Sequence, residues 1–314
     1  MNRREGLTAY ILVVCTLLAG WAVRAAEDFR GTWTMEHSDE PGKVEFTLIH
    51  HQHGNSSTHS SDWPLSVFVG LDTAKAGKQE VKFTINRDAG RFDCEGYLEN
   101  GEGAGTFHFL ADSKYVSEMN SLGFTGIDPE KQFSLAVLDV SLNFAKEMKG
   151  EHLQGLDTDK LIAFRIFKVN SQFIHELRDA GIDASDCDKL VAFRIHGVTP
   201  EMVRFLRKSG YQPTDDDLIA MRIHGATPEF IQQLQKEGYD HVAIEKLIAF
   251  RIHGVSPEFI AKVQALGYKH PDPDQLIAMR IHGVTPEYIS GLKSRGMQNL
   301  SIDQLVSLRI QGID

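Results

Sequence analysis

Four histidines lie close together near residue 50, and imidazole clusters of this kind can bind transition metals. They are His50, His51, His53 and His59. In an extended strand, His51 and His53 share one face, and His59 can return to them from a polar loop over residues 54–62. Three such imidazoles could bind zinc or copper. No cysteine or carboxylate motif accompanies them, and the alternative is a solvated strand end followed by a polar loop. We therefore expect no metal and no cofactor, and take His51, His53 and His59 as the metal candidates to check.

An arginine recurs at one position of a repeated motif. On a helix that turns about 100° per residue, Arg251 falls inside the apolar arc, between Leu247 and Ile248. A guanidinium in apolar surroundings needs acceptors, and Glu258 stands seven residues later. The equivalent arginines are Arg165, Arg194, Arg222, Arg251 and Arg280, with a sixth at Arg309, and the glutamates are Glu201, Glu229, Glu258 and Glu287. We predict a structural ladder of arginine–glutamate pairs. The alternative is a stripe that binds anions.

A histidine also recurs in the motif, at His196, His224, His253 and His282. Four histidines in register suggest a metal-binding or pH-sensing row. Equivalent helices of stacked units lie about 10 Å apart, which is too far for neighbouring histidines to share one ion. A histidine at a helix C-terminus also interacts favourably with the negative end of the helix dipole, and we prefer this interpretation.

Known catalytic motifs are missing from the sequence. There is no His-Glu-x-x-His zinc motif, no Gly-x-Ser-x-Gly elbow, no Walker loop and no dinucleotide fingerprint. The formal net charge is −10, without the basic surplus of a protein that binds a phosphate backbone. We therefore expect a protein that is not an enzyme and does not bind nucleic acid. The alternative is a metal-dependent enzyme that uses the cluster from His50 to His59.

The elements that carry these residues belong to a repeat of about 29 residues that begins near Asp112. The best copy of its motif runs from Leu247 to Ile260 and contains the corner Arg251-Ile252-His253-Gly254-Val255-Ser256-Pro257-Glu258. Gly254 supplies a left-handed residue that ends one helix, and Ser256 and Pro257 begin the next. We divide residues 112–314 into seven units of two short helices each. Helices of about nine residues are marginal alone in water, so the units must stack into an array.

Residues 28–109 follow a period of two instead, as in strands that are buried on one face. We expect about six antiparallel strands, curled into a small sandwich or barrel over residues 27–111. The fold class is therefore α+β, with an N-terminal β domain followed by an α-helical repeat array. Because the period changes sharply near Asp112, we expect the two parts to fold separately.

Residues 1–26 resemble a secretory signal peptide, with Arg3 and Arg4 before an apolar run and Ala25-Ala26 at its end. We expect the protein to be periplasmic or secreted. The alternative is an uncleaved segment that anchors the protein to the membrane by its N-terminus. Two cysteines follow the leader, Cys94 and Cys187, and two buried thiols are a better interpretation than a single bridge.

Several segments together resemble a group of bacterial secreted proteins with a β domain and two-helix repeats of about 29 residues. These segments are Gly103–Phe109, Tyr115–Met119, Leu122–Phe124 and the Ile-His-Gly-Val-Thr-Pro-Glu-Tyr corner. The repeats are also similar to those in the extracytoplasmic tails of regulatory membrane metallopeptidases of the β-lactam-sensor type. The peptidase part is absent from this sequence, so the resemblance implies an exported repeat module without protease activity.

These observations lead to one expectation for function. We expect an exported, non-enzymatic binding or scaffold module, or a sensor module, that acts through protein–protein interaction in the bacterial envelope. A repeat array offers the long surface that such a role requires.

Overall fold

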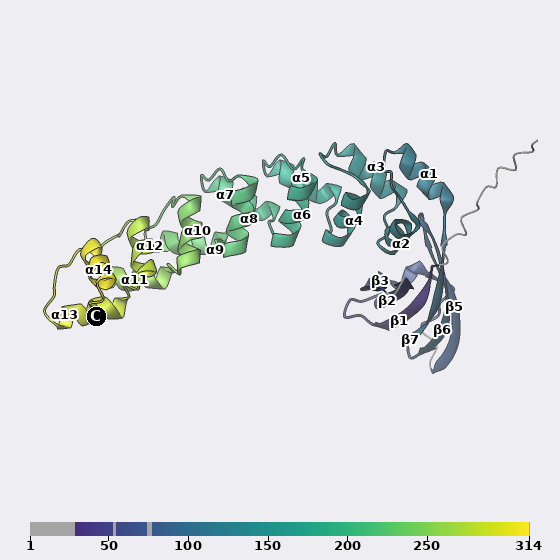
Figure 1. Cartoon of the computed structure of the whole chain (residues 1–314), viewed down its shortest axis with the longest axis horizontal. Coiled ribbons are helices and arrows are strands. Elements are labelled where there is room, and N and C mark those ends of the chain that lie inside the picture. Colours follow the sequence, from purple (N-terminus) through teal and green to yellow (C-terminus); the bar gives the residue numbers. More distant parts are fainter. Residues whose placement is uncertain (1–28, 53–54, 74–76, 314) are drawn as a thin grey trace, which may run out of the picture.

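The computed structural model describes residues 29–52, 55–73 and 77–313, and the leader at residues 1–26 lies outside this part. The described chain is α+β, as predicted: a seven-stranded antiparallel sheet followed by fourteen helices. Figure 1 shows the sheet at one end and the helices running away from it as an arched array. Within the described residues, no helix has the length and apolar character needed to cross a bilayer.

The sheet is a single curled layer, a half-barrel. Its strands are β1 (Phe29–His37), β2 (Lys43–Gln52), β3 (Asn55–Pro64), β4 (Phe68–Val69), β5 (Lys78–Arg87), β6 (Gly90–Glu99) and β7 (Glu102–Ala111). They lie in the order β3-β2-β1-β7-β6-β5-β4, so β3 and β4 form the two edges. The polar segment 54–62, which we expected to be a loop, therefore belongs largely to strand β3. Its run of serines and threonines hides the alternation because an edge strand can be solvated on both faces.

The inner face of the half-barrel is packed with aromatic side chains. Trp33 is fully buried and its indole Nε1 donates to the carbonyls of Glu95 (3.3 Å) and Thr106 (3.1 Å). The indole reaches these carbonyls because Gly96 lies beneath it, where a Cβ would come within 2.8 Å of the ring. The free thiol of Cys94 is buried in the same core, and that of Cys187 is buried at the start of helix α6 (Cys187–His196).

The first helical pair, α1 (Ser113–Ser121) and α2 (Pro129–Val137), closes one end of the half-barrel. Phe133 of α2 is buried among rings of the sheet: Phe29, His50, His59, Phe92, Phe107 and Phe109. Its ring stacks on Phe29 at a centroid distance of 5.4 Å. The buried Gln132 side chain donates to the carbonyls of Ala89 and Asp112, both at 2.8 Å. Helix α2 therefore belongs to the sheet core as much as to the array.

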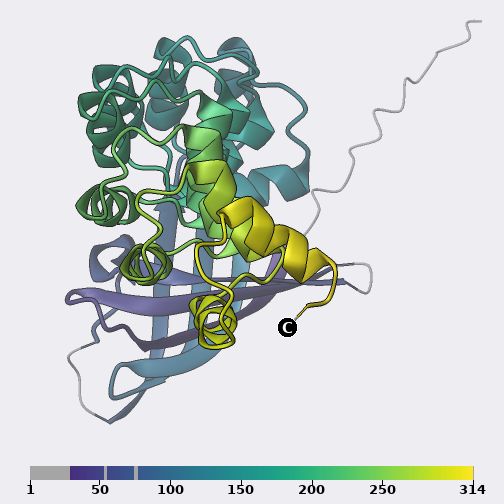
Figure 2. The same cartoon turned by 90° about the vertical axis from the view of Figure 1, so that its left-hand side faces the viewer.

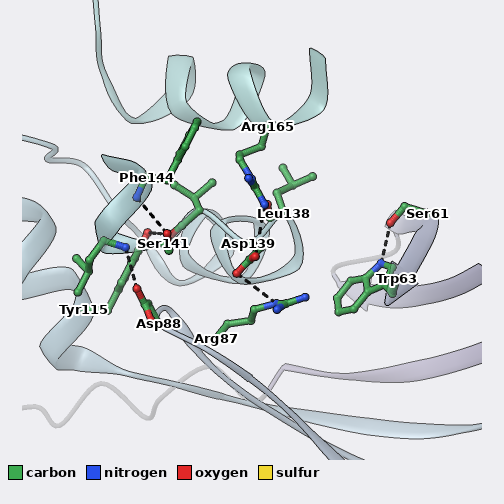
Figure 3. Close-up of polar contacts among 12 residues, drawn as sticks. Ser61, Trp63, Arg87, Asp88, Tyr115, Leu138, Asp139, Ser141, Phe144 and Arg165 are labelled. Atoms are coloured by element: carbon green, nitrogen blue, oxygen red, sulfur yellow. Dashed lines mark hydrogen bonds and ion pairs between the residues drawn. The ribbon is translucent and has the colours of Figure 1, made fainter. Parts of the chain in front are cut away.

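Polar contacts extend this junction into the second helical pair, α3 (Leu142–Gly150) and α4 (Thr158–Phe167). Asp139 lies between Arg87 of the sheet (3.5 Å) and Arg165 of α4 (3.4 Å), as Figure 3 shows. Arg87 also lies over the ring of Trp63, 4.8 Å from its centroid. The Asp88 carboxylate accepts a hydrogen bond from the backbone N–H of Leu142 at 2.8 Å. These contacts favour one shared folding unit over the separately folding parts that we expected from the sequence.

The remaining helices continue the pairing along the chain. We call the first helix of each pair the A helix and the second the B helix. The further A helices are α5 (Ser171–Asp179), α7 (Pro200–Lys208), α9 (Pro228–Lys236), α11 (Pro257–Ala265) and α13 (Pro286–Ser294). The further B helices are α6, α8 (Asp215–His224), α10 (Ile244–His253), α12 (Pro273–Ile281) and α14 (Ile302–Ile310).

The corner between units forms as predicted. Gly254 is left-handed with φ 73°, and the Ser256 side chain accepts from the N–H of Phe259. The N–H of the buried Val255 donates back to the carbonyl of Phe250 at 2.7 Å. Because every unit repeats this corner, all B helices point the same way.

The B helices form the inner row of the arch. Neighbouring B helices contact each other more extensively than neighbouring A helices do. In Figure 1, α4, α6 and α8 lie beneath α3, α5 and α7, whereas toward the C-terminal end α10, α12 and α14 lie above α9, α11 and α13. The view from the C-terminal end in Figure 2 shows that the array is also coiled.

We predict that Phe133→Ala lowers the free energy of unfolding by about 3–5 kcal/mol, the usual range for emptying a buried phenylalanine site. Because Phe133 lies in the sheet core, tryptophan fluorescence from Trp33 and Trp63 and helical circular dichroism should shift together in urea. Phe205→Ala, at a half-buried site of α7, is the matched control and should cost much less. A shift confined to the helical signal would contradict the shared folding unit.

Candidate functional site

The recurring arginines lie on the B helices, but the structure gives them different partners from the predicted glutamates. The Nε of four of them donates to the carbonyl at the end of the preceding B helix: Arg165 to Leu138 (2.8 Å), Arg222 to His196 (3.2 Å), Arg251 to His224 (3.4 Å) and Arg280 to His253 (3.3 Å). A cation at this point meets the negative end of the helix dipole and an unsatisfied carbonyl. Each of these arginines thus joins its own unit to the one before it.

An aromatic ring of the A helix in the same unit supports most of these guanidiniums. The pairs are Arg165 with Phe144, Arg194 with Phe173, Arg251 with Phe230, Arg280 with Phe259 and Arg309 with Tyr288. The ring always stands 21 residues before the arginine. Arg222 lies in the unit that is one residue shorter, and Met202 occupies the equivalent position there. The arginines therefore lie against apolar rings, although Arg165, Arg251 and Arg280 are exposed, and their Nε hydrogen bonds go to backbone carbonyls.

The predicted glutamates lie at the starts of A helices, exposed to solvent: Glu201, Glu229, Glu258 and Glu287. The pKa of Glu258 is lowered by its own backbone N–H and by the Ser256 hydroxyl. The pKa values of Glu201, Glu229 and Glu287 are lowered by the same kinds of contact, with Arg204 adding an ion pair to Glu201 and the charge of Arg222, its predicted partner, lowering that of Glu229 further. These glutamates stabilise helix N-termini. The repeated contacts of the arginines are with a backbone carbonyl and an aromatic ring.

Arg194 shows what the closing glycine contributes. At four corners this glycine lies beside the next arginine, and a Cβ on Gly254 would come within 2.9 Å of Arg280 Nη2, whereas the corner before Arg165 holds Asp139. Lys168 replaces the glycine after α4, with φ 57°. The Nε of Arg194 is buried without a hydrogen-bond partner, and its guanidinium lies 3.7 Å from the centroid of Phe173, nearer than in the other pairs. At the corner where Lys168 replaces glycine, Arg194 therefore lies against the ring of Phe173, and its Nε makes no hydrogen bond to the preceding B helix.

The histidines at residues 50–59 do not assemble into a described metal site. His50 points into the core, its Nδ1 2.9 Å from the carbonyl of Arg30. His59 lies on β3 opposite Leu48, and not in a loop. His51 pairs with Ser56 through the backbone, its side chain lies outside the described part, and His53 lies outside it entirely. Over residues 29–52, 55–73 and 77–313, no three histidine, cysteine or acidic side chains are grouped to hold a metal ion.

The recurring histidines contribute through their backbone. The carbonyls of His196, His224 and His253 accept the hydrogen bonds from the arginines of the next unit. The side chains of His224, His253 and His282 are exposed, and that of His196 is half-buried. Their position at the ends of B helices agrees with the dipole interpretation.

A row of exposed isoleucines is the feature that the sequence analysis missed. One isoleucine in each B helix from α4 to α14 is 52–63% exposed: Ile166, Ile195, Ile223, Ile252, Ile281 and Ile310. Apart from Ile313, these are the large exposed hydrophobic residues of the described array. One turn earlier stands a half-buried aliphatic residue: Ile162, Val191, Ile219, Ile248, Ile277 or Val306. We call these twelve residues the aliphatic strip, and it runs along the inner row of helices.

The aliphatic strip is bordered by an acidic row at the N-terminal ends of the B helices. The row consists of Asp159, Asp188, Asp216, Glu245, Asp274 and Asp303, all exposed. Seven residues separate Glu245 from Ile252, which places both within about 20° on the same face of α10. The arginines and the helix C-termini border the other side of the strip. The inner face therefore has an acidic edge, an aliphatic centre and a basic edge.

Lysines of neighbouring units bind several members of the acidic row. Lys131 lies 2.8 Å from Asp159, and Lys160, Lys189 and Lys246 pair with Asp188, Asp216 and Asp274. These pairs are largely exposed and contribute little to stability. They hold the carboxylates in register along the edge of the strip.

Comparisons with protein-family models, with curated proteins and with solved structures find no match to this chain.

We predict that Arg251 is energetically coupled to Phe230 and not to Glu258. A double-mutant cycle of Arg251→Ala and Phe230→Leu should give a coupling free energy of about 0.5–1 kcal/mol, as for an exposed cation–π contact. Arg251→Ala and Glu258→Ala should be additive in urea unfolding. Arg222→Ala with Met202→Leu is the control without a ring and should show no coupling. A stronger coupling to Glu258 than to Phe230 would restore the predicted ladder.

Lys168→Gly should raise the free energy of unfolding by about 1 kcal/mol, because glycine tolerates the left-handed φ and releases Arg194 to reach the carbonyl of Phe167. Thermal and urea unfolding of the purified protein measure the change. In an Arg194→Ala background the gain should shrink to the backbone contribution alone. A loss of stability in Lys168→Gly would show that a contact of the Lys168 side chain stabilises the fold more than glycine does at this left-handed position.

The contact between β3 and α2 should weaken as the pH falls. Burial lowers the pKa of His59, whose ring lies at 6.3 Å from that of Phe133, below the ordinary value of 6.5. The unfolded chain then takes up the proton more readily, so stability is lost as the pH falls from about 6.5 through the folded pKa. His59→Gln should show a smaller loss of unfolding free energy between pH 7.5 and 5 than the unaltered protein. Equal losses of unfolding free energy in the two proteins would show that protonation of His59 does not cause the pH dependence.

Proposed function

We propose that this protein is an exported, non-enzymatic binding or scaffold module that holds a protein partner along the inner face of its repeat array. The observation that carries the proposal is the register of six isoleucines, each more than half exposed, at one position of successive B helices. Single exposed apolar residues are ordinary on a protein surface, but a continuous aliphatic strip is typical of an interaction site.

The exposed isoleucines of the strip do not contribute to the packed core of the array. Leu247 and Phe250 fill the core beneath α10 and are fully buried, whereas Ile252 of the same helix projects to solvent. Polar residues occupy exposed positions of the A helices, such as Gln232 and Gln233 of α9. An exposed isoleucine repeated only on the inner face favours a partner that covers it.

The bacterial envelope is the compartment that we propose for this binding. The support comes from the sequence of residues 1–26, which has the pattern of a secretory signal, and from the resemblance to exported repeat proteins. An array bound to a sheet at one end is suited to a scaffold or to the sensing part of an envelope system.

A photo-crosslinking residue placed at Ile223, in the middle of the strip, tests the proposal in the native envelope. We expect Ile223 to crosslink to a protein, and the matched position Gln233 on the outer A helix α9 to give no such product. The product should disappear when Ile195 and Ile252, which flank Ile223 on neighbouring helices, are changed to Ser. Equal crosslinking from Ile223 and Gln233, or none from either, would overturn the proposal.

A further inference from the structure

The inner face also indicates what kind of chain segment can occupy it, an inference that rests on the proposed function. The aliphatic strip is continuous across six B helices, from Ile166 on α4 to Ile310 on α14. Packed helices lie about 8–10 Å apart, so the strip offers one exposed isoleucine about every 10 Å along the array.

The strip offers almost no hydrogen-bonding groups to a bound backbone. Its floor consists of isoleucine and valine side chains with alanines beside them, such as Ala249 next to Ile248. An extended peptide laid on this floor would bury unpaired N–H and C=O groups, which is costly. An α-helix satisfies its own backbone groups, so it can cover an aliphatic floor without that cost.

The spacing of the strip also matches a helix. Seven residues of an α-helix rise about 10.5 Å, so apolar residues at every seventh position coincide with successive B helices. A second row of apolar residues, three or four positions away, would contact the half-buried aliphatic residues such as Ile219 and Ile248.

The charges at the two edges of the strip favour a bound helix that carries the opposite charge on each flank. The acidic row, from Asp159 to Asp303, borders one side of the strip, and arginines such as Arg222 and Arg251 border the other. Lysines or arginines on one flank of the bound helix would face the acidic row, where they would share four of its carboxylates with lysines of this chain, and acidic residues on its other flank would face the arginines.

We infer that the aliphatic strip binds an amphipathic α-helix of a partner protein, with apolar residues in a seven-residue repeat and basic residues along one flank. The curvature of the inner face argues against a second copy of the array, because two concave faces cannot contact each other along their length. A straight helix of three or four heptads lies along part of the arch and spans a matching number of B helices.

A displayed library of random 24-residue peptides, selected on the full chain and counter-selected on the Ile223→Ser/Ile252→Ser variant, tests the inference. We expect enriched sequences with apolar residues at i, i+3 or i+4, and i+7, and with lysine or arginine concentrated on one flank. Enriched sequences with strict alternation or a proline-rich pattern, or no sequence that depends on the strip, would overturn the inference.

Fluorescence anisotropy with the most enriched peptide then measures each contribution. Ile223→Ser/Ile252→Ser should raise the Kd by about tenfold or more, since two buried apolar contacts are lost. Asp216→Asn/Glu245→Gln should also raise the Kd and reduce its dependence on salt. Gln232→Ser/Gln233→Ser is the matched control on the outer side and should leave the Kd unchanged. Because all these positions are exposed, the urea midpoints of the variants should stay close to that of the unaltered protein.

The same variants also test two other occupants of the strip, a second copy of the chain and a lipid surface. A dimer in sedimentation that Ile223→Ser/Ile252→Ser dissolves would assign the strip to a second copy. Strip-dependent binding to vesicles of anionic phospholipid would assign it to a lipid surface. Either result overturns the helical partner. If peptides fail while Ile223 still crosslinks a protein in the envelope, the proposed function stands and only the class of segment is wrong.

Discussion

The structure depends on one constraint, that helices of nine or ten residues cannot exist alone in water. Each pair of helices from α3 onward buries its apolar face against the pair before it. The first pair has no such neighbour on one side, and the sheet takes that place. Phe133 inserts into the open end of the half-barrel, and Gln132 satisfies the carbonyls of Ala89 and Asp112 beside it. The sheet is thus the cap from which the array begins.

Neighbouring units are joined by a recurring contact that links three elements at once. The arginine of a B helix reaches the end of the preceding B helix and, in most units, stacks on the ring of its own A helix. In such units one arginine therefore contacts both the preceding B helix and its own A helix. At four corners a glycine makes room for this arrangement, and at the corner where Lys168 takes its place the Nε of Arg194 has no hydrogen-bond partner.

Much of this architecture could be predicted from the sequence because its causes are local. The repeat, the corner at Gly254 and the alternation of strands such as Val81–Ile85 depend on near neighbours in the chain. Strand β3 could not be predicted, since a polar edge strand has no apolar alternation to reveal it. The partners of the arginines also needed the fold. The ring lies 21 residues away and the carbonyl 26 or 27, both outside the range of a helical wheel.

The exposed isoleucines illustrate a signal that was present but was interpreted too simply. The apolar arc of α10 runs from Phe250 through Leu247 to Ile252, wider than one core-facing side requires. Ile252 lies at the edge of this arc and is 54% exposed. The apolar arc is wider than the core requires on all six B helices. This width distinguishes a helix that only packs against the core from one that also exposes an apolar surface to a partner.

The confinement of each unit's contacts to its neighbours has a mechanical consequence. If the two ends of the array were pulled apart, force would pass through a series of similar interfaces, and the weakest would open first. Each unit of about 29 residues would then release roughly 100 Å of extended chain. The unit after Lys168, whose arginine has lost its carbonyl, is a natural weak point near the sheet. The array would yield stepwise and act as an extensible spring, with the sheet and its first helical pair as a firm attachment.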